Sequence, residues 1–280
     1  MTQERVKELA LLAQDIRITG LKMLQWSRSG HLGGAFSMAE LMAVLYFDKM
    51  NVRPEQPDWA ERDRFVLSKG HCTVALYPTL AMRGFFPAER LQEFRKIDGH
   101  LSGHAEMRYV PGVDMSTGSL GQGVSCAAGM AKGAKYLGQD INVYTLLGDG
   151  EIEEGEVWEA FMFAAHYKLD NLCVIIDLNG LQIDGPTEKV MNSAPVDAKM
   201  EAFGFNVITI NGHDYDQIEG AFNAFRACTG KPTAILMHTT KGKGVKYMEN
   251  NVDWHGKAPN DAEYEVAMNE LRAAMAELEA

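Results

Sequence analysis

The sequence predicts an α/β fold in which a parallel sheet carries helices on both faces. From residue 118 onward, short apolar runs typical of buried strands alternate with helical patterns. One of these runs ends in a glycine-flanked aspartate, Asp149, and the next ends in Asn179. Polar residues at successive strand ends are typical of the edge at which open α/β sheets bind ligands. The 280 residues contain no linker or internal repeat, so we expect one domain spanning residues 1–280.

The N-terminal part of the chain predicts helices and one short strand. Apolar residues at helical spacing indicate an amphipathic helix over 3–28, which a glycine-rich break follows. We expect a second helix to begin at Ser37, because serine is a good N-cap and Glu40 lies three positions further on. Residues 64–68 indicate a strand, and a helix then runs to about Arg83.

The rest of the chain predicts one long loop followed by regular alternation. Residues 84–117 are rich in Gly, Pro and His and too long for a simple connection, which is typical of a functional loop. Gly118–Gly123 opens a helix of small residues that runs to about Tyr136. The later strands are expected near 142–147, 172–177, 206–211 and 233–238, and the helices near 155–168, 196–203, 214–228 and 261–279.

Composition narrows the class of protein. The net charge of −11 and the pI near 5.2 argue against nucleic-acid binding. No stretch approaches the 18 or so apolar residues of a membrane span, so we expect no membrane insertion. The four cysteines form no CxxC pair and indicate a reducing compartment. We therefore expect a cytoplasmic protein.

Asp149 and Asn179 indicate a cation site. A carboxylate and an amide oxygen suit a hard cation such as Mg²⁺, which is usually shared with substrate phosphates. The backbone carbonyl of Leu181 offers a third ligand. The alternative is a strand-end turn with an unrelated asparagine nearby. The second strand, ending in Asn179 at a suitable distance, favours the cation site.

Two glycine-rich loops are candidates for contact with a phosphate group. Three glycines within Gly118–Gly123 allow the backbone to approach a ligand closely. Lys241–Gly244 is a basic, glycine-flexed loop in an acidic protein. Each loop has a simpler interpretation, as a packed turn or a solvated turn, and neither is a Walker A sequence.

Histidines recur in glycine-rich turns. Histidine can act as an acid, a base or a hydrogen-bond donor near neutral pH. A single histidine of this kind is more often structural, but the pattern recurs in four loops and is harder to dismiss. His166 and His238 stand in other contexts and are expected to be structural. The histidines in glycine-rich turns are His31, His71, His100, His104 and His255.

The chain resembles the N-terminal, diphosphate-binding half of transketolases, and most closely the N-terminal subunits of split transketolases. The similarity extends through nearly the whole chain. Single-chain members usually have proline where Leu32 and Ala105 stand here, and many have an apolar loop at Lys241. The motifs that carry the resemblance are Ser29–His31, Leu67–His71, Gly103–Glu106, Thr117–Gly123, Gly148–Gly150 with Glu154–Gly155, Asn179, Ile183–Gly185 and Trp254–Pro259.

The resemblance implies the thiamine diphosphate-binding fold and a site that holds thiamine diphosphate with Mg²⁺ or Ca²⁺. Asp149, Asn179 and the Leu181 carbonyl would hold the metal. His31, His71, His104 and His255 would be catalytic, and the first three would face the donor sugar and the reacting carbonyl. Glu154 and Glu159 match acidic positions at the interface between active sites. The implied cofactor-binding residues are His71, Gly118, Leu120, Gly148, Gly150, Glu154, Asn179, Lys241 and His255.

The resemblance also implies a partner. In the family, the glutamate that activates the cofactor and most of the residues that hold the sugar phosphate belong to a second, pyrimidine-binding module. We therefore expect a separate C-terminal subunit, an α₂β₂ assembly, and transfer of a two-carbon ketol unit between sugars or sugar phosphates. The alternatives are a subunit of another thiamine diphosphate enzyme, of the deoxyxylulose phosphate synthase or 2-oxoacid dehydrogenase type, and a non-catalytic cofactor-binding partner.

Overall fold

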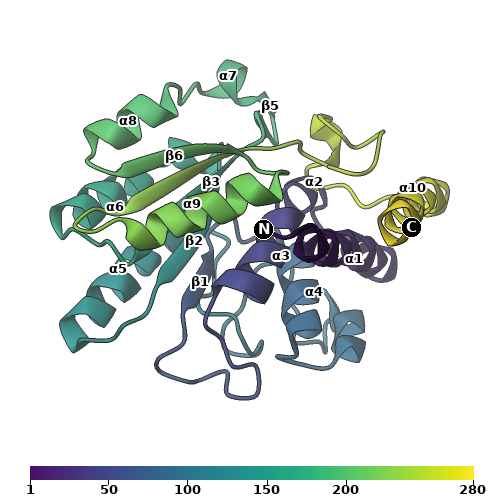
Figure 1. Cartoon of the computed structure of the whole chain (residues 1–280). Helices are drawn as coiled ribbons and strands as arrows, with labels where there is room; N and C mark the ends of the chain where they lie inside the picture. Colours follow the sequence, from purple (N-terminus) through teal and green to yellow (C-terminus); the bar gives the residue numbers. More distant parts are fainter.

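A five-stranded parallel sheet lies at the centre of the computed structural model, which describes all residues from Met1 to Ala280 (Figure 1). Its strand order is β1-β2-β3-β7-β6, with crossovers that carry helices. The predicted parallel α/β fold is confirmed. The strands are β1 (Arg64–Leu67), β2 (Val143–Gly148), β3 (Leu172–Leu178), β6 (Asn206–Asn211) and β7 (Thr233–His238).

Helices cover both faces of the sheet (Figure 1). The longer helices are α1 (Gln3–Ser27), α4 (Thr73–Arg83), α5 (Gln122–Leu137), α6 (Gly155–His166), α9 (Tyr215–Ala227) and α10 (Asp261–Glu279). The short ones are α2 (Gly33–Phe36), α3 (Ala39–Val44), α7 (Thr187–Val190) and α8 (Val196–Ala202).

Alternating side chains on the strands build two separate cores. Along β3, Cys173 and Ile175 point into the larger core, which α1, α3, α4 and α9 cover. Val174 and Ile176 point to the opposite face, into a smaller core that α5, α6 and α8 cover. Because successive residues of a strand face opposite sides, a strand buried on both sides is apolar throughout, as the sequence pattern predicted.

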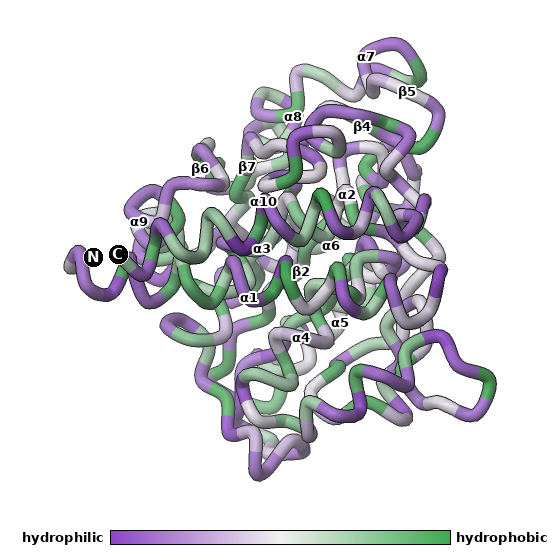
Figure 2. The backbone as a smooth tube through the Cα atoms, turned by 90° about the vertical axis from the view of Figure 1, so that its right-hand side faces the viewer, coloured by the Kyte–Doolittle hydropathy of each residue, from purple (hydrophilic) through white to green (hydrophobic).

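Helix α10 runs along α1 on the outer side of the larger core (Figure 2). The two helices are antiparallel, since Gln14 donates to the Leu271 carbonyl at 2.7 Å and Gln25 donates to Asp261 at 2.8 Å. A capping box at Asn260 and Glu263 begins α10 at the predicted residue. The C-terminal helix is therefore tied to the N-terminal one.

The prediction that Ser37 caps a helix is wrong. Residue Met38 takes the N-cap position of α3, without a side-chain capping bond. The hydroxyl of Ser37 instead donates to Asp177 at 2.6 Å and lies 3.0 Å from the Gly34 carbonyl. Ser37 therefore bonds to the buried carboxylate of Asp177, whereas the local pattern predicted that it caps a helix.

Other departures lie at element ends and in loops. The glycines from Gly118 to Gly121 form a turn, and α5 begins only at Gln122. Residues 84–117 are irregular as predicted and contain one 3₁₀ helix, Ala88–Glu93. The sequence did not predict the small hairpin of β4 (Leu181–Gln182) and β5 (Gly185–Pro186). None of the helices is both long and apolar enough to cross a bilayer.

Candidate functional site

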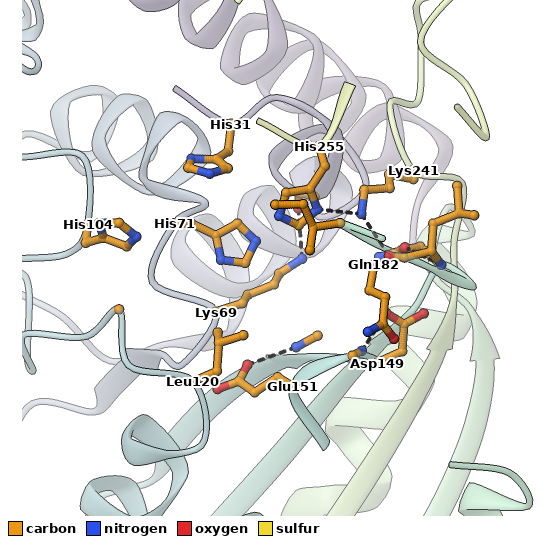
Figure 3. A pocket seen from close by; sticks show the side chains of 17 residues that line it. His31, Lys69, His71, His104, Leu120, Asp149, Glu151, Gln182, Lys241 and His255 are labelled. Atoms are coloured by element: carbon orange, nitrogen blue, oxygen red, sulfur yellow. Dashed lines mark hydrogen bonds between the residues drawn. The ribbon is translucent and has the colours of Figure 1, made fainter. Parts of the chain in front are cut away.

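A cavity of about 290 Å³ opens at the carboxyl edge of β2 and β3 (Figure 3). Parallel strands end together there, and the segments that follow β1, β2, β3 and β7 each contribute residues. The cavity brings together nearly all of the candidate residues that the sequence scatters over more than two hundred positions: His31, His71, His104, Gly118, Leu120, Gly148, Asp149, Gly150, Asn179, Leu181, Lys241 and His255.

Glu154 and Glu159 lie outside this cavity. Glu154 takes the N-cap position of α6, and its side chain is exposed. Glu159 is exposed on the same helix and lines a separate shallow groove between α5 and α6. The structure thus places Glu154 beside the glycine turn at Gly121 and not among the cavity-lining residues.

Asp149 is held by two backbone N–H groups. Gly150 donates to one carboxylate oxygen at 2.9 Å, and Gly180 donates to the other at 2.5 Å. Burial, followed by the nearby charge of Asp177, raises the pKa of Asp149 to about 6. A carboxylate that is costly to ionise without a counter-ion is suited to a cation as its partner.

Asn179 has its amide fixed at both ends. Its amide nitrogen donates to Asp177 at 3.1 Å, and its carbonyl oxygen accepts from the Leu181 N–H at 3.2 Å. The carboxylate of Asp177 can only accept, so the contact assigns which end of the amide carries the nitrogen. The oxygen therefore lies on the Leu181 side.

Lys241 lies inside the cavity and not in a solvated turn. The residue is 2% exposed, and its ammonium donates to the Leu181 carbonyl at 2.8 Å and contacts His255 Nδ1 at 2.9 Å. An ammonium has no acceptor, so His255 must accept at Nδ1 and carry its proton on Nε2. Burial lowers the pKa of Lys241 from its ordinary value.

The four candidate catalytic histidines form one cluster (Figure 3). The ring centroid of His31 lies 5.1 Å from that of His71, 6.2 Å from that of His104 and 5.6 Å from that of His255. The rings of His71 and His255 are 5.1 Å apart. His100, which shares the sequence pattern, is exposed and stacks on Tyr109 away from the cavity.

The cluster is held in its neutral form. Burial, together with smaller contributions from nearby positive charges, lowers the pKa of His31 to about 4 and that of His255 to about 3. The pKa of His71 falls well below its ordinary value for the same first cause, and that of His104 is also lowered. Neutral imidazoles each offer one donor and one acceptor, as polar recognition of hydroxyl and carbonyl groups requires.

Two glycines are needed for close approach. Gly118 has φ of +144°, and a Cβ there would lie 3.0 Å from the His104 ring. A Cβ at Gly150 would lie 2.9 Å from the Cβ of Gln182. These positions therefore require glycine for conformation and space respectively.

Sequence reasoning missed three charged residues, of which Lys69 and Glu151 line the cavity and Asp177 lies beneath it. Lys69 donates to Asp177 at 2.6 Å and to the Gly34 carbonyl at 2.8 Å. Glu151 accepts from Ser68 and from the N–H groups of Gly121 and Gly148, so it joins the turn before α5 to the end of β2. Burial raises the pKa of Glu151. Its position directly after Gly150 was the available signal, whereas nothing local marked Asp177.

The residues present fit a divalent cation. Asp149, Asn179 and Leu181 supply a carboxylate, an amide carbonyl and a backbone carbonyl, which are the hard oxygen ligands that Mg²⁺ and Ca²⁺ prefer. The Leu181 carbonyl accepts from Lys241, which shows that a positive charge is favourable at that oxygen. The basic side chains around the cavity complement an anion beside the cation.

Comparison with known proteins agrees with this geometry. The family described as "Transketolase, thiamine diphosphate binding domain" matches residues 9–275. An apulose-4-phosphate transketolase subunit of Phocaeicola vulgatus is 41% identical over 275 residues, 98% of each chain. The 6-deoxy-6-sulfo-D-fructose transketolase subunit SqwG of a Clostridium species is 43% identical over 242 residues, 86% of this chain and 88% of the relative.

Single-chain transketolases match over part of their length. Human transketolase is 40% identical over 256 residues, which are 91% of this chain but 40% of the human protein. The solved transketolase of Campylobacter jejuni superposes with a TM-score of 0.89 at 32% identity, over 99% of this chain and 46% of that chain. The chain thus spans less than half of these larger proteins. It belongs to the transketolase family, in which it matches the thiamine diphosphate binding domain.

Proposed function

We propose that this chain is the diphosphate-binding subunit of a two-chain transketolase, which moves a two-carbon ketol unit from a ketose to an aldose. The observation that carries the proposal is one cavity with two parts. One part is an oxygen clamp formed by Asp149, Asn179 and the Leu181 carbonyl. The other part is the cluster of four histidines that are held neutral. A clamp alone would fit many diphosphate ligands. Neutral donors and acceptors beside it fit a polyol substrate with a reacting carbonyl.

The clamp side would hold the cofactor. Asp149, Asn179 and the Leu181 carbonyl would hold Mg²⁺ or Ca²⁺, whose positive charge would favour the binding of a diphosphate. Lys241 and His255 would donate to diphosphate oxygens, since both present N–H groups to the cavity. The residues proposed to neighbour the cofactor through backbone or side chain are His71, Gly118, Leu120, Gly148 and Gly150.

The histidine side would handle the sugar. When bound, thiamine diphosphate supplies a nucleophilic carbon and stores an electron pair. His31, His71 and His104 would orient the hydroxyl groups and the carbonyl of the ketose by hydrogen bonds. His104, the exposed member of the cluster, would take a proton from the sugar or give one to it. His255 would donate from Nε2, because Lys241 occupies Nδ1.

A companion subunit would complete the site. Relatives of the same length carry subunit designations, and the single-chain relatives are more than twice as long. We infer that the companion supplies the pyrimidine-binding module and most contacts to the far end of the sugar, in an α₂β₂ assembly. The substrates would be sugars or sugar phosphates, as the names of the relatives indicate for those proteins. All four cysteines are unpaired, which suits the cytoplasm.

The test is reconstitution. The chain is purified alone and also co-expressed with a companion pyrimidine-binding subunit encoded nearby, and ketol transfer is assayed with thiamine diphosphate and Mg²⁺ over a panel of donors and acceptors. We expect transfer by the pair and none by either chain alone. Full activity of this chain alone would contradict the two-chain proposal, and inactivity of the pair on every ketose would contradict the reaction.

A further inference from the structure

A buried carboxylate lies directly beneath the clamp. Asp177 belongs to β3, and its side chain is completely buried. In the sheet it pairs with Gly148 of β2 and Met237 of β7, so it lies at the end of the sheet just before the cavity. It does not line the cavity and cannot touch a ligand there.

Asp177 accepts hydrogen bonds from four separate segments. Ser37 and Lys69 each donate to Oδ2 at 2.6 Å, and Asn179 donates to the same oxygen at 3.1 Å. Thr239 donates to Oδ1. Each of these donors either lines the cavity or lies within a few residues of a residue that does. Asp177 therefore connects the segments that build the site.

The contact with Asn179 has a specific chemical consequence. An amide has a donor end and an acceptor end of nearly the same shape, and only its oxygen can bind a cation. Asp177 can accept but not donate, so it holds the amide nitrogen of Asn179 on its own side. A flipped amide would place oxygen against carboxylate and present N–H groups to the cation.

We propose that Asp177, with Lys69 as its counter-ion, is a positioning residue that fixes the amide of Asn179 with its oxygen available to the divalent cation. The inference rests on the proposed cation role of Asp149 and Asn179. Lys69 compensates the buried charge at 2.6 Å, so the carboxylate can stay an acceptor inside the core. Outer partners of this kind typically change metal affinity about 10- to 100-fold.

The experiment measures Mn²⁺ binding to the full chain by electron paramagnetic resonance, with thiamine diphosphate present in excess. Asp177→Leu, which removes every acceptor at this position, is expected to raise the Kd for Mn²⁺ about 10- to 100-fold, since the amide of Asn179 loses the contact that holds its nitrogen. Thr239→Val is the matched control, because it removes another donor from the same carboxylate and leaves the Asn179 contact in place. We expect this variant to bind within about threefold of the wild type.

A second variant separates orientation from general damage. Asn179→Asp adds a charge to the clamp but sets two carboxylates against each other, so alone it should weaken Mn²⁺ binding. In the double variant with Asp177→Leu, the carboxylate at 179 binds a cation in either orientation and no longer faces a second carboxylate. We therefore expect the double variant to bind Mn²⁺ at least about tenfold more tightly than either single variant.

The outcomes distinguish the inference from the function beneath it. If Asp149→Ala binds Mn²⁺ as tightly as the wild type, both the proposed cation site and this inference are wrong. Loss in Asp149→Ala but wild-type affinity in Asp177→Leu overturns the inference alone. If Asp177→Leu does not fold, as thermal unfolding would show, the Asn179→Asp variant still decides. Tighter Mn²⁺ binding by that single variant would mean that charge, and not orientation, governs the position.

Discussion

The two sides of the cavity differ in how far the protein has already satisfied their polar atoms (Figure 3). On the clamp side, Asp149 accepts two N–H groups and Asn179 is bonded at both ends of its amide. On the histidine side, the rings contact one another, but Nδ1 of His31 is buried with no partner. His104 is exposed.

This difference indicates that the two sides have separate roles. The clamp is preorganised, because its geometry is set by strand ends and by a buried carboxylate before any ligand arrives. The histidine side keeps free hydrogen-bonding capacity for a polar ligand. We therefore expect clamp variants to act on cofactor binding and histidine variants to act on turnover.

The largest effect is expected on the clamp side. Asp149→Ala removes the only carboxylate among the three proposed cation ligands, so the affinity for thiamine diphosphate with Mg²⁺ should fall at least about 100-fold, beyond the loss typical of outer-shell changes. Calorimetric titration with and without EDTA measures it. Asp140→Ala, at an exposed site, is the control. Cofactor affinity equal to the wild type would show that the cation lies elsewhere.

The histidine side should respond in turnover. His104→Ala removes the exposed member of the cluster, so kcat/KM of the assembled enzyme is expected to fall about 10²- to 10⁴-fold, the range of acid–base catalysis. Its affinity for thiamine diphosphate should remain within about threefold. His100→Ala is a close control, since His100 lies four residues away and stacks on Tyr109 outside the cavity. Equal losses in both variants would contradict a direct role for His104.

Lys241 joins the two sides, because its ammonium contacts both the Leu181 carbonyl and His255. Lys241→Met should raise the Kd for thiamine diphosphate about 10- to 100-fold, which corresponds to about 1.5–3 kcal/mol for a hydrogen bond to a charged group. The comparison variant is Lys243→Met, whose side chain is 41% exposed and pairs with Glu249. An effect on turnover alone would place Lys241 on the histidine side.

The sequence predicted the sheet and most of the cavity, because both depend on local signals. Apolar runs specify strands that are buried on both faces, and residues directly after parallel strands must meet at one edge. Asn179 and Asp149 were found in this way. The resemblance to a known family added roles to His71 and Leu120 that spacing alone does not provide.

The residues that the sequence did not predict depend on contacts between segments that are far apart in the sequence. Asp177 is one polar residue inside an apolar strand, and only the fold brings Ser37, Lys69 and Thr239 to it. Ser37 was assigned to a helix cap for the same reason, since the local pattern contains no sign of a partner 140 residues away.

The smallest expected effect concerns stability, and its dependence on pH is opposite on the two sides. The folded-state pKa of Asp149 is raised to about 6 from 3.8, so without metal its ionisation destabilises the fold as the pH rises through this window. Asp149→Asn should therefore raise the free energy of unfolding at pH 7 by roughly 1–3 kcal/mol, because a pKa difference of one corresponds to about 1.4 kcal/mol. Urea denaturation in EDTA measures the gain, which should vanish near pH 4.

His31 should show the reverse dependence. Its folded-state pKa is lowered to about 4 from 6.5, so protonation favours the unfolded chain, and stability is lost as the pH falls from 6.5 toward 4. His31→Gln, which cannot be protonated, should make the loss of stability in acid shallower and leave stability above pH 7 nearly unchanged. Suppose that Asp149→Asn is more stable than the wild type at neutral pH and that His31→Gln is more stable only in acid. The charged form of each residue then destabilises the fold on its own side of the cavity. Parallel pH profiles for the two variants would instead mean that the two sides share one electrostatic environment, and the division between them would fail.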